Sequence, residues 1–379
     1  MAISTAPNRT HAARWLHTGE EAFTRMLPAI ERARRSVRLE FYIYTADYIG
    51  TKVRDALVDA ARRGVNVRVL LDAFGAVGLP AGFWTTLQHF GGEVRWFNPF
   101  TWRLFAFRNH RKLLLVDDTV AFVGGFNISD VYNGDGVTRG WRDLGMELRQ
   151  PEAIKQLAAA FDDMFDGSDL HQRVLSRMKA PWRVSNRRGP VLLSGPRMGR
   201  NPFRSNLLKL LKRARHVRIV SGYFLPSLRL RHALRQVARR GGTVELLLAG
   251  KSDVPLAQLA GRVRYGSLLR AGVRIFEYQP QILHAKLAVI DDVVFVGSSN
   301  LDTRSFGINY ELMVRCDDEN LAESGRKMFA ADLAHSKEIT LEGWRNAQTW
   351  LTRMQGMWAA FLLTKIDPWL AHVQRRSMS

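Results

Sequence analysis

The chain has 379 residues, 46% of them apolar and 24% charged, which is the composition of a globular protein long enough for two or three domains. Lysine and arginine total 56 against 35 aspartate and glutamate, and this formal charge of +21 predicts a polyanionic partner, either anionic lipid or nucleic acid. The single cysteine, Cys316, excludes an intrachain disulfide and fits a reducing compartment.

The first half of the chain alternates strand-like and helix-like segments, distinguished by the spacing of their apolar residues. In chain order the pattern predicts a strand over 37–44, a helix over 52–64, strands over 65–72 and 94–97, and a helix over 151–165. The helix over 52–64 is amphipathic and ends at a glycine, as helices commonly do.

The second half repeats this order of elements. Strands are predicted over 217–224, 244–250 and 273–276, and helices over 230–242 and 318–335. A repeat of this length indicates two homologous units. The simplest architecture is therefore α/β, with two lobes of mixed β-sheet flanked by helices, related by a pseudo-twofold axis and holding one active site between them.

On this basis the chain divides into four parts. They are a first lobe over 1–165, a basic connector over 166–200, a second lobe over 201–335, and an amphipathic, tryptophan-rich basic tail over 336–379. The connector is placed where prolines and glycines accumulate between the two repeats.

The pattern His-x-Lys-x-x-x-x-Asp occurs once in each half, and each copy continues into an apolar hairpin that ends in asparagine. The residues are His110, Lys112, Asp117 and Asn127 in the first copy, and His284, Lys286, Asp291 and Asn300 in the second. Side chains two apart on a strand share a face, so each histidine is expected beside its lysine. The double aspartate that ends each motif fits a turn into the next strand.

A single histidine in an apolar strand is most often a satisfied core residue. The same histidine and lysine placed twice favour a functional site instead, because an unpaired buried lysine is costly. Two histidines and two lysines suit phosphoryl chemistry without a metal or other cofactor. One neutral histidine can attack phosphorus while the other protonates the departing alkoxide. The lysines, with Asn127 and Asn300, would hold the phosphate oxygens.

With these motifs the chain resembles the phospholipase D superfamily, whose signature is the duplicated motif with a downstream asparagine. The resemblance implies two phospholipase D-like lobes, and it implies that carboxylates further along, Asp143 and Glu311, orient the catalytic histidines. Asp117 and Asp291, although part of the motif, are then expected to be structural residues that fix their hairpins. Segments 40–50, 60–75, 109–118 and 222–227 are most similar to bacterial cardiolipin synthases that lack N-terminal transmembrane helices.

This resemblance implies a phosphatidyltransferase that joins two phosphatidylglycerol molecules into cardiolipin and glycerol through a phosphohistidine. It also implies His110 as the nucleophile and His284 as the acid and base. A phospholipase D-type lipid hydrolase and a phosphodiesterase or nuclease of the same superfamily remain alternatives. A binding protein that has lost catalysis is disfavoured, because both motifs are intact.

A basic segment predicts a polyanionic partner, and two segments with apolar residues beside the basic ones favour an anionic phospholipid membrane surface over nucleic acid. Residues 171–244 contain 19 lysines and arginines and no aspartate or glutamate, although such a run can be merely a solvated face. The loop 98–110 interleaves aromatic and basic residues, which could enter a bilayer, stack on bases or line the cleft. In the tail, apolar residues between Trp344 and Trp369 follow helical spacing, which fits an interfacial helix or a helix packed on the second lobe.

The location expected from the sequence is the cytoplasmic side of the cell membrane, with peripheral attachment. No apolar run reaches the 18 or more residues that span a bilayer, and the N-terminus has no apolar stretch typical of a signal peptide. The lipid acceptor, the acyl-chain preference and the oligomeric state are left open by the sequence.

Overall fold

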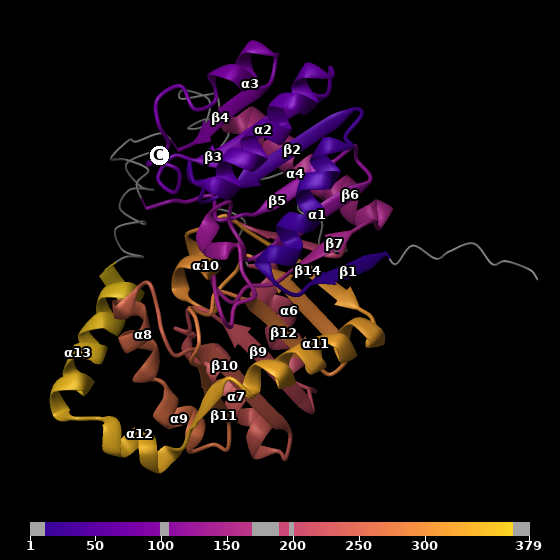
Figure 1. Cartoon of the computed structure of the whole chain (residues 1–379). Helices are drawn as coiled ribbons and strands as arrows, with labels where there is room; N and C mark the ends of the chain where they lie inside the picture. The colour runs from indigo at the N-terminus through magenta and orange to yellow at the C-terminus, as the bar shows by residue number, and fades with distance from the viewer. Residues whose placement is uncertain (1–11, 99–105, 169–188, 197–200, 367–379) are drawn as a thin grey trace, which may run out of the picture.

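The computed structural model describes residues 12–98, 106–168, 189–196 and 201–366, which fold into two lobes, each a mixed sheet flanked by helices (Figure 1). The α/β architecture predicted from the repeat is confirmed. The first lobe comprises β1 (Ala13–Leu16), α1 (Gly19–Glu31), β2 (Ser36–Phe41), α2 (Tyr48–Arg62), β3 (Asn66–Asp72), α3 (Thr85–His89), β4 (Glu93–Phe97), β5 (Leu113–Val116), β6 (Val120–Gly124), β7 (Gly145–Leu148) and α4 (Pro151–Ser168). Its sheet has the order β1-β7-β6-β5-β2-β3-β4.

The second lobe is built in the same sequence of elements. It comprises β8 (Val191–Ser194), α6 (Pro202–Leu211), β9 (His216–Ser221), α7 (Leu228–Arg239), β10 (Thr243–Ala249), α8 (Pro255–Arg262), α9 (Tyr265–Leu269), β11 (Arg274–Tyr278), β12 (Lys286–Ile290), β13 (Val293–Gly297), α10 (Thr303–Gly307), β14 (Glu311–Asp317), α11 (Glu319–Leu333) and β15 (Ser336–Ile339). Its sheet has the order β15-β11-β10-β9-β12-β13-β14-β8.

The strand pairing corrects two predicted boundaries. β8 pairs antiparallel with β14 as β1 pairs with β7, so the second repeat already begins inside the segment 166–200 that was predicted to be a connector. The sheet of the second lobe also continues to β15, which pairs with β11, so the tail does not start at residue 336. Both strands are only four residues long, which is too short for a periodic pattern to identify.

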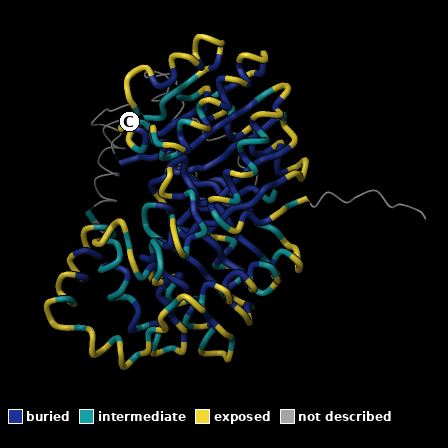
Figure 2. The backbone as a smooth tube through the Cα atoms, viewed as in Figure 1, coloured by how far each residue is buried: buried dark blue, intermediate teal, exposed yellow. Residues whose placement is uncertain are grey.

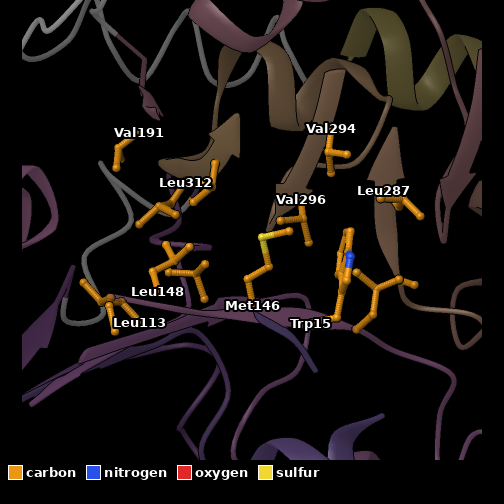
Figure 3. Close-up of a cluster of buried hydrophobic side chains, with 14 of the residues drawn as sticks. Trp15, Leu113, Met146, Leu148, Val191, Leu287, Val294, Val296 and Leu312 are labelled. Atoms are coloured by element: carbon orange, nitrogen blue, oxygen red, sulfur yellow. The ribbon is translucent and has the colours of Figure 1, made fainter. Parts of the chain in front are cut away.

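The two lobes share one hydrophobic core rather than meeting at a loose hinge. Trp15 and Met146 of the first sheet belong to the same buried cluster as Val294, Val296 and Leu312 of the second (Figure 3). Figure 2 shows buried backbone running continuously through the middle of the molecule. Interfaces of this kind hold two units in a fixed relation, because separating them would expose the apolar surface of both.

The tail does not form the single helix that its apolar spacing predicted. After β15 the chain forms α12 (Leu341–Ala347), α13 (Trp350–Phe361) and a short π-helical segment (Leu362–Ile366). Trp344 of α12 donates its indole N–H to the carbonyl of Arg262 over 3.0 Å, which fixes the start of the tail on the second lobe.

Small residues of α13 pack on α8. Gly356, Ala359 and Ala360 are buried there, beside Leu259 and Val263. The large apolar residues of the predicted stripe between residues 351 and 362 are exposed instead (Figure 2). One face of the tail therefore packs on the second lobe, as one alternative predicted, and the other face is exposed, so that an interfacial role stays a prediction. Among the described residues, no helix is both long and apolar enough to cross a bilayer.

Replacing Leu312 by alanine is expected to lower the free energy of unfolding by about 2–5 kcal/mol, because the side chain is 1% exposed in the shared core. Urea denaturation followed by circular dichroism should still show one transition, since both lobes depend on that core. Leu256→Ala is the matched control, because Leu256 is 41% exposed and its loss should change stability by less than about 0.5 kcal/mol. Two separate transitions, of which Leu312→Ala shifts only one, would contradict the shared core.

Candidate active site

Each His-x-Lys pair lies at the start of the strand that follows it. His110 and Lys112 precede β5, and His284 and Lys286 lead into β12, the strands that pair antiparallel with β2 and β9. All four side chains are buried. The loop that precedes the first motif was predicted to place aromatic residues at the mouth of the site. Its residues 99–105 lie outside the described part of the chain, and Phe107 beyond them is a buried residue.

Two main-chain bridges between the lobes bring the motifs together. The backbone N–H of His110 donates to the carbonyl of Tyr310 over 2.9 Å, and that of His284 donates to the carbonyl of Arg142 over 2.8 Å. Both bridges are parallel, pairing Asn109 with Tyr310 and Arg142 with Leu283. In each bridge, one of the paired residues is followed in the chain by a motif histidine and the other by a carboxylate residue. His110 and Glu311 follow the first bridge, and Asp143 and His284 follow the second.

The carboxylates consequently pair with the histidines across the lobe boundary. Glu311 of the second lobe lies 3.0 Å from Nδ1 of His110, and Asp143 of the first lobe lies 2.6 Å from Nδ1 of His284. The sequence identified both carboxylates as candidates but did not say which histidine each one serves. Because every pair takes one partner from each lobe, neither half-site is complete without the other lobe.

The protonation states follow from burial and from these pairs. Burial lowers the pKa of both His110 and His284 to about 4, and the lysines add to this effect while the carboxylates oppose it. Burial alone would raise the pKa of Asp143 and Glu311, yet their histidine partners and the nearby lysines hold both below their usual values. At neutral pH each ring is thus neutral, with its Nδ1–H donated to an ionised carboxylate and the lone pair of Nε2 available.

The lysines lie against the main chain of their own motif. Nζ of Lys112 donates to the carbonyl of His110 over 2.7 Å, and Nζ of Lys286 donates to the carbonyl of His284. Burial lowers the pKa of Lys112 well below its usual range and that of Lys286 to about 8. Each lysine also acts electrostatically on the histidine of the other motif, so the four basic groups form a single cluster. Such a cluster suits a phosphate, whose negative charge would favour protonation of these groups.

The two asparagines accept main-chain N–H groups just beyond the ends of β2 and β9. Oδ1 of Asn127 accepts the N–H of Ile43 over 3.1 Å, and its Nδ2 donates to the hydroxyl of Tyr132 over 2.7 Å. Oδ1 of Asn300 accepts the N–H of Tyr223 over 3.3 Å. One hydrogen of the Asn127 amide is therefore already used within the lobe, and phosphate binding by Asn127 and Asn300 stays a prediction.

Asp117 and Asp291 lie at the opposite ends of their strands from the histidines. The carboxylate of Asp117 accepts the N–H groups of Arg35 and Ser36 over 2.7 and 2.9 Å, and that of Asp291 accepts the N–H of His216 over 2.8 Å. Both aspartates have positive φ, at 54° and 49°, as a tight turn between two strands requires. They close hairpins and do not contact the histidines, so their place in the catalytic motif is structural.

Aromatic side chains around the histidines were not identified as site residues from the sequence. Tyr42 lies 5.0 Å from the ring of His110, between ring centroids, whereas Tyr132, Trp141 and Tyr223 lie 5.4, 5.6 and 6.4 Å from that of His284. Their positions at the ends of the first strands and after the hairpins could have been found by superposing the repeats. The two half-sites are thus unequal, with the richer aromatic surroundings at His284.

A second inequality concerns the carboxylates. Ser298 donates its hydroxyl to Glu311, but its counterpart in the first half is Gly125. A Cβ atom at Gly125 would lie only 2.2 Å from Oδ1 of Asp143, so only glycine fits there without a shift. No group of three or more histidine, cysteine, aspartate or glutamate residues in the described ranges is arranged to hold a metal ion.

A family model described as cardiolipin synthase, phospholipase D-like domain, matches residues 26–165 and 207–333. The chain belongs to this family. Cardiolipin synthase 1 of Bacillus cereus is 34% identical over 350 residues, which cover 88% of this chain and 68% of that protein. Cardiolipin synthase A of Pseudomonas aeruginosa is 34% identical over 363 residues, which cover 93% of this chain and 73% of the relative. The predicted family is thereby confirmed.

Solved structures support the fold of this cardiolipin synthase family member. A phosphatidylserine synthase from Haemophilus influenzae superposes with a TM-score of 0.76 over 95% of both chains, at 14% sequence identity. A polyphosphate kinase from Porphyromonas gingivalis superposes with a TM-score of 0.60 over 87% of this chain and 49% of its own. At such low identity the likeness concerns the fold alone, which both lobes share.

Asp143→Asn is expected to lower kcat on the order of 10²–10⁴-fold without unfolding the protein, because His284 would lose the anion that fixes its tautomer and stabilises its protonated form. Asp117→Ala serves as the control, since this carboxylate accepts main-chain N–H groups at the start of β2 and does not contact a histidine. The control should lower the free energy of unfolding by about 1–3 kcal/mol and leave kcat of the folded protein unchanged. Equal losses of kcat in the two variants would contradict the separation of roles.

The pH profile of kcat/KM should be bell-shaped, with limbs near pH 4 and pH 8. The acid limb arises because His110, with a pKa of about 4, becomes protonated below that pH and loses the free Nε2 with which it would attack phosphorus. The alkaline limb arises because Lys286, with a pKa of about 8, loses its positive charge as the pH rises. A profile of steady-state rates from pH 3.5 to 10 checks this, and activity that is constant from pH 7 to 10 would refute the role given to Lys286.

Proposed function

We propose that this cardiolipin synthase joins two phosphatidylglycerol molecules into cardiolipin and glycerol through a phosphohistidine intermediate. The observation that carries the proposal is the pair of crossed histidine–carboxylate contacts. These leave two Nε2 atoms available beside two buried lysines. A nucleophile and an acid–base catalyst at one phosphate are what two successive displacements need.

In the first displacement Nε2 of His110 attacks the phosphorus of one phosphatidylglycerol. The phosphorus–nitrogen bond forms as the bond to the glycerol oxygen breaks, and His284 gives that oxygen its proton. The lysines stabilise the charge on the other phosphate oxygens. Both rings are neutral in the empty site. His284 must therefore become protonated when the substrate binds, and the negative charge of the incoming phosphate favours this.

Two features support His284 as the residue that becomes cationic. Its carboxylate contact is shorter than that of His110, at 2.6 against 3.0 Å. Three aromatic rings surround it, and ring faces stabilise a nearby cation. The ammonium group of Lys286 acts in the opposite sense, which again makes the charge of the bound phosphate necessary.

In the second displacement a hydroxyl of the second phosphatidylglycerol attacks the phosphohistidine. His284 takes the hydroxyl proton, the phosphorus–nitrogen bond breaks, and His110 returns to its neutral state. A hydrolase would use the same residues with water as the acceptor. The burial of both histidines favours the lipid acceptor, because a site closed to bulk water favours transfer over hydrolysis.

The reaction is proposed to take place on the anionic surface of the cell membrane, at its cytoplasmic side, with the enzyme attached peripherally. The net charge of +21 supports this location, since basic residues near an anionic bilayer contribute about 1 kcal/mol each. Phosphatidylglycerol is itself anionic, so the charge that attracts the protein to the surface also concentrates it at its substrate.

The purified protein should form cardiolipin from phosphatidylglycerol vesicles, and His110→Ala and His284→Ala should each reduce this by at least about 10³-fold, measured by mass spectrometry of the lipids. His216→Ala is the matched control, because this histidine is exposed and belongs to no motif. Phosphatidic acid as the main product would identify a lipid hydrolase. Cleavage of DNA without turnover of lipid would refute the proposal.

A further inference from the structure

Three arginines of the second lobe lie together without an acidic partner among the residues that the structure describes. Arg231 and Arg235 are one turn apart on α7, and Arg264 lies between α8 and α9. Arg231 is close enough to the other two for their charges to lower its pKa further, after burial. Nε of Arg231 and Nε of Arg235 are covered by protein and have no hydrogen-bond partner.

Two other arginines of the described chain, one buried and one partly buried, illustrate the usual pairing with an acid. Arg142 contacts Asp332 at 2.8 Å, and Arg262, two residues before Arg264, contacts Glu277 at 2.7 Å. A like-charged cluster with covered, unsatisfied donors is costly unless an anion completes it. Guanidinium groups suit a phosphate, because their forked donors can bind two of its oxygens at once.

The helix α13 lies near this cluster. Val263, the neighbour of Arg264 in the chain, packs against Gly356 of α13, and Figure 1 shows α13 running along α8 at the outer edge of the second lobe. The large apolar residues that this edge exposes are Trp350, Leu351, Met354, Met357, Trp358, Phe361 and Leu362. Trp350 is 74% exposed and Trp358 60%, which is unusual for side chains of this size.

We infer that Arg231, Arg235 and Arg264 bind the phosphate of an anionic phospholipid headgroup while the outer face of α13 enters the bilayer interface. Basic residues beside exposed tryptophan and aliphatic side chains are typical of helices that lie at a membrane surface. None of these residues belongs to the catalytic motifs. The inference rests on one part of the proposed function, namely that the substrate is a membrane lipid.

The aliphatic part of this face favours a bilayer over nucleic acid. Leu351, Met354 and Met357 offer no stacking surface for bases, whereas acyl chains accept them readily. The buried face of α13 is already occupied by α8, so the exposed face is available without rearranging the lobe. Membrane contact by a rigid packed helix would also hold the enzyme in one orientation.

Vesicle flotation tests the inference, with phosphatidylcholine vesicles that do or do not contain phosphatidic acid, which has no alcohol group to transfer. In the triple variant Arg231→Gln, Arg235→Gln and Arg264→Gln, binding to the anionic vesicles should weaken on the order of 100-fold, at roughly fivefold for each basic residue. The control variant removes the same charge from exposed positions of the first lobe, with the substitutions Arg32→Gln, Arg34→Gln and Lys155→Gln. It should weaken binding much less. Equal weakening of the two variants would overturn the site, because it would show an effect of net charge alone.

The apolar half of the surface is tested by Trp358→Glu, which should reduce vesicle binding at least tenfold, against Phe90→Glu on the exposed surface of the first lobe as the control. Turnover of phosphatidylglycerol in detergent micelles should be unchanged in the docking variants. Failure of the proposed function is therefore distinguishable, since it would abolish micelle turnover in the unmodified protein. If Trp358→Glu dissociates a dimer in sedimentation experiments and vesicle binding stays intact, the face binds a second copy and the inference is wrong.

Discussion

The composite site depends on two buried histidine–carboxylate hydrogen bonds that cross from one lobe to the other. A carboxylate removed from water is stable only when cationic or hydrogen-bonding partners complete it, and here those partners come from the opposite repeat. Asp143 serves His284, and Glu311 serves His110. The two lobes must therefore meet in one register, because a slip of one residue at either main-chain bridge would separate both pairs.

The remainder of the interface makes this register permanent. The core that joins Met146 to Val296 and Leu312 is apolar and continuous, so the polar pairs do not have to hold the lobes together. Their protonation states can instead suit the proposed reaction. The histidines are neutral, the carboxylates are ionised, and the pKa values of the nearby lysines are lowered. In the proposed mechanism, stability and catalysis are carried by different residues, and Asp117 and Asp291 bind only main-chain N–H groups away from the histidines.

Much of this could be predicted from the sequence, because its signals are local and repeated. The strands around residues 37–44 and 217–224, the His-x-Lys pairs and the identity of the two carboxylates all follow from periodicity or from resemblance. The crossed pairing could not be predicted, since it depends on how two folded lobes meet. The packing of the tail could not be predicted either, because an apolar stripe does not show which face of a helix a neighbouring element will cover. In α13 the neighbour covers Gly356 and Ala359, and the stripe stays outside.

The most direct test of the composite site is the position of the covalent adduct. Phosphatidylglycerol is mixed with the enzyme, the reaction is stopped by denaturation at alkaline pH to preserve phosphohistidine, and the peptides are mapped by mass spectrometry. The account predicts one phosphatidyl group per chain on His110, formed much more slowly in Glu311→Gln although Glu311 lies in the other lobe. An adduct on His284, or rapid cardiolipin formation with no histidine adduct, would contradict it.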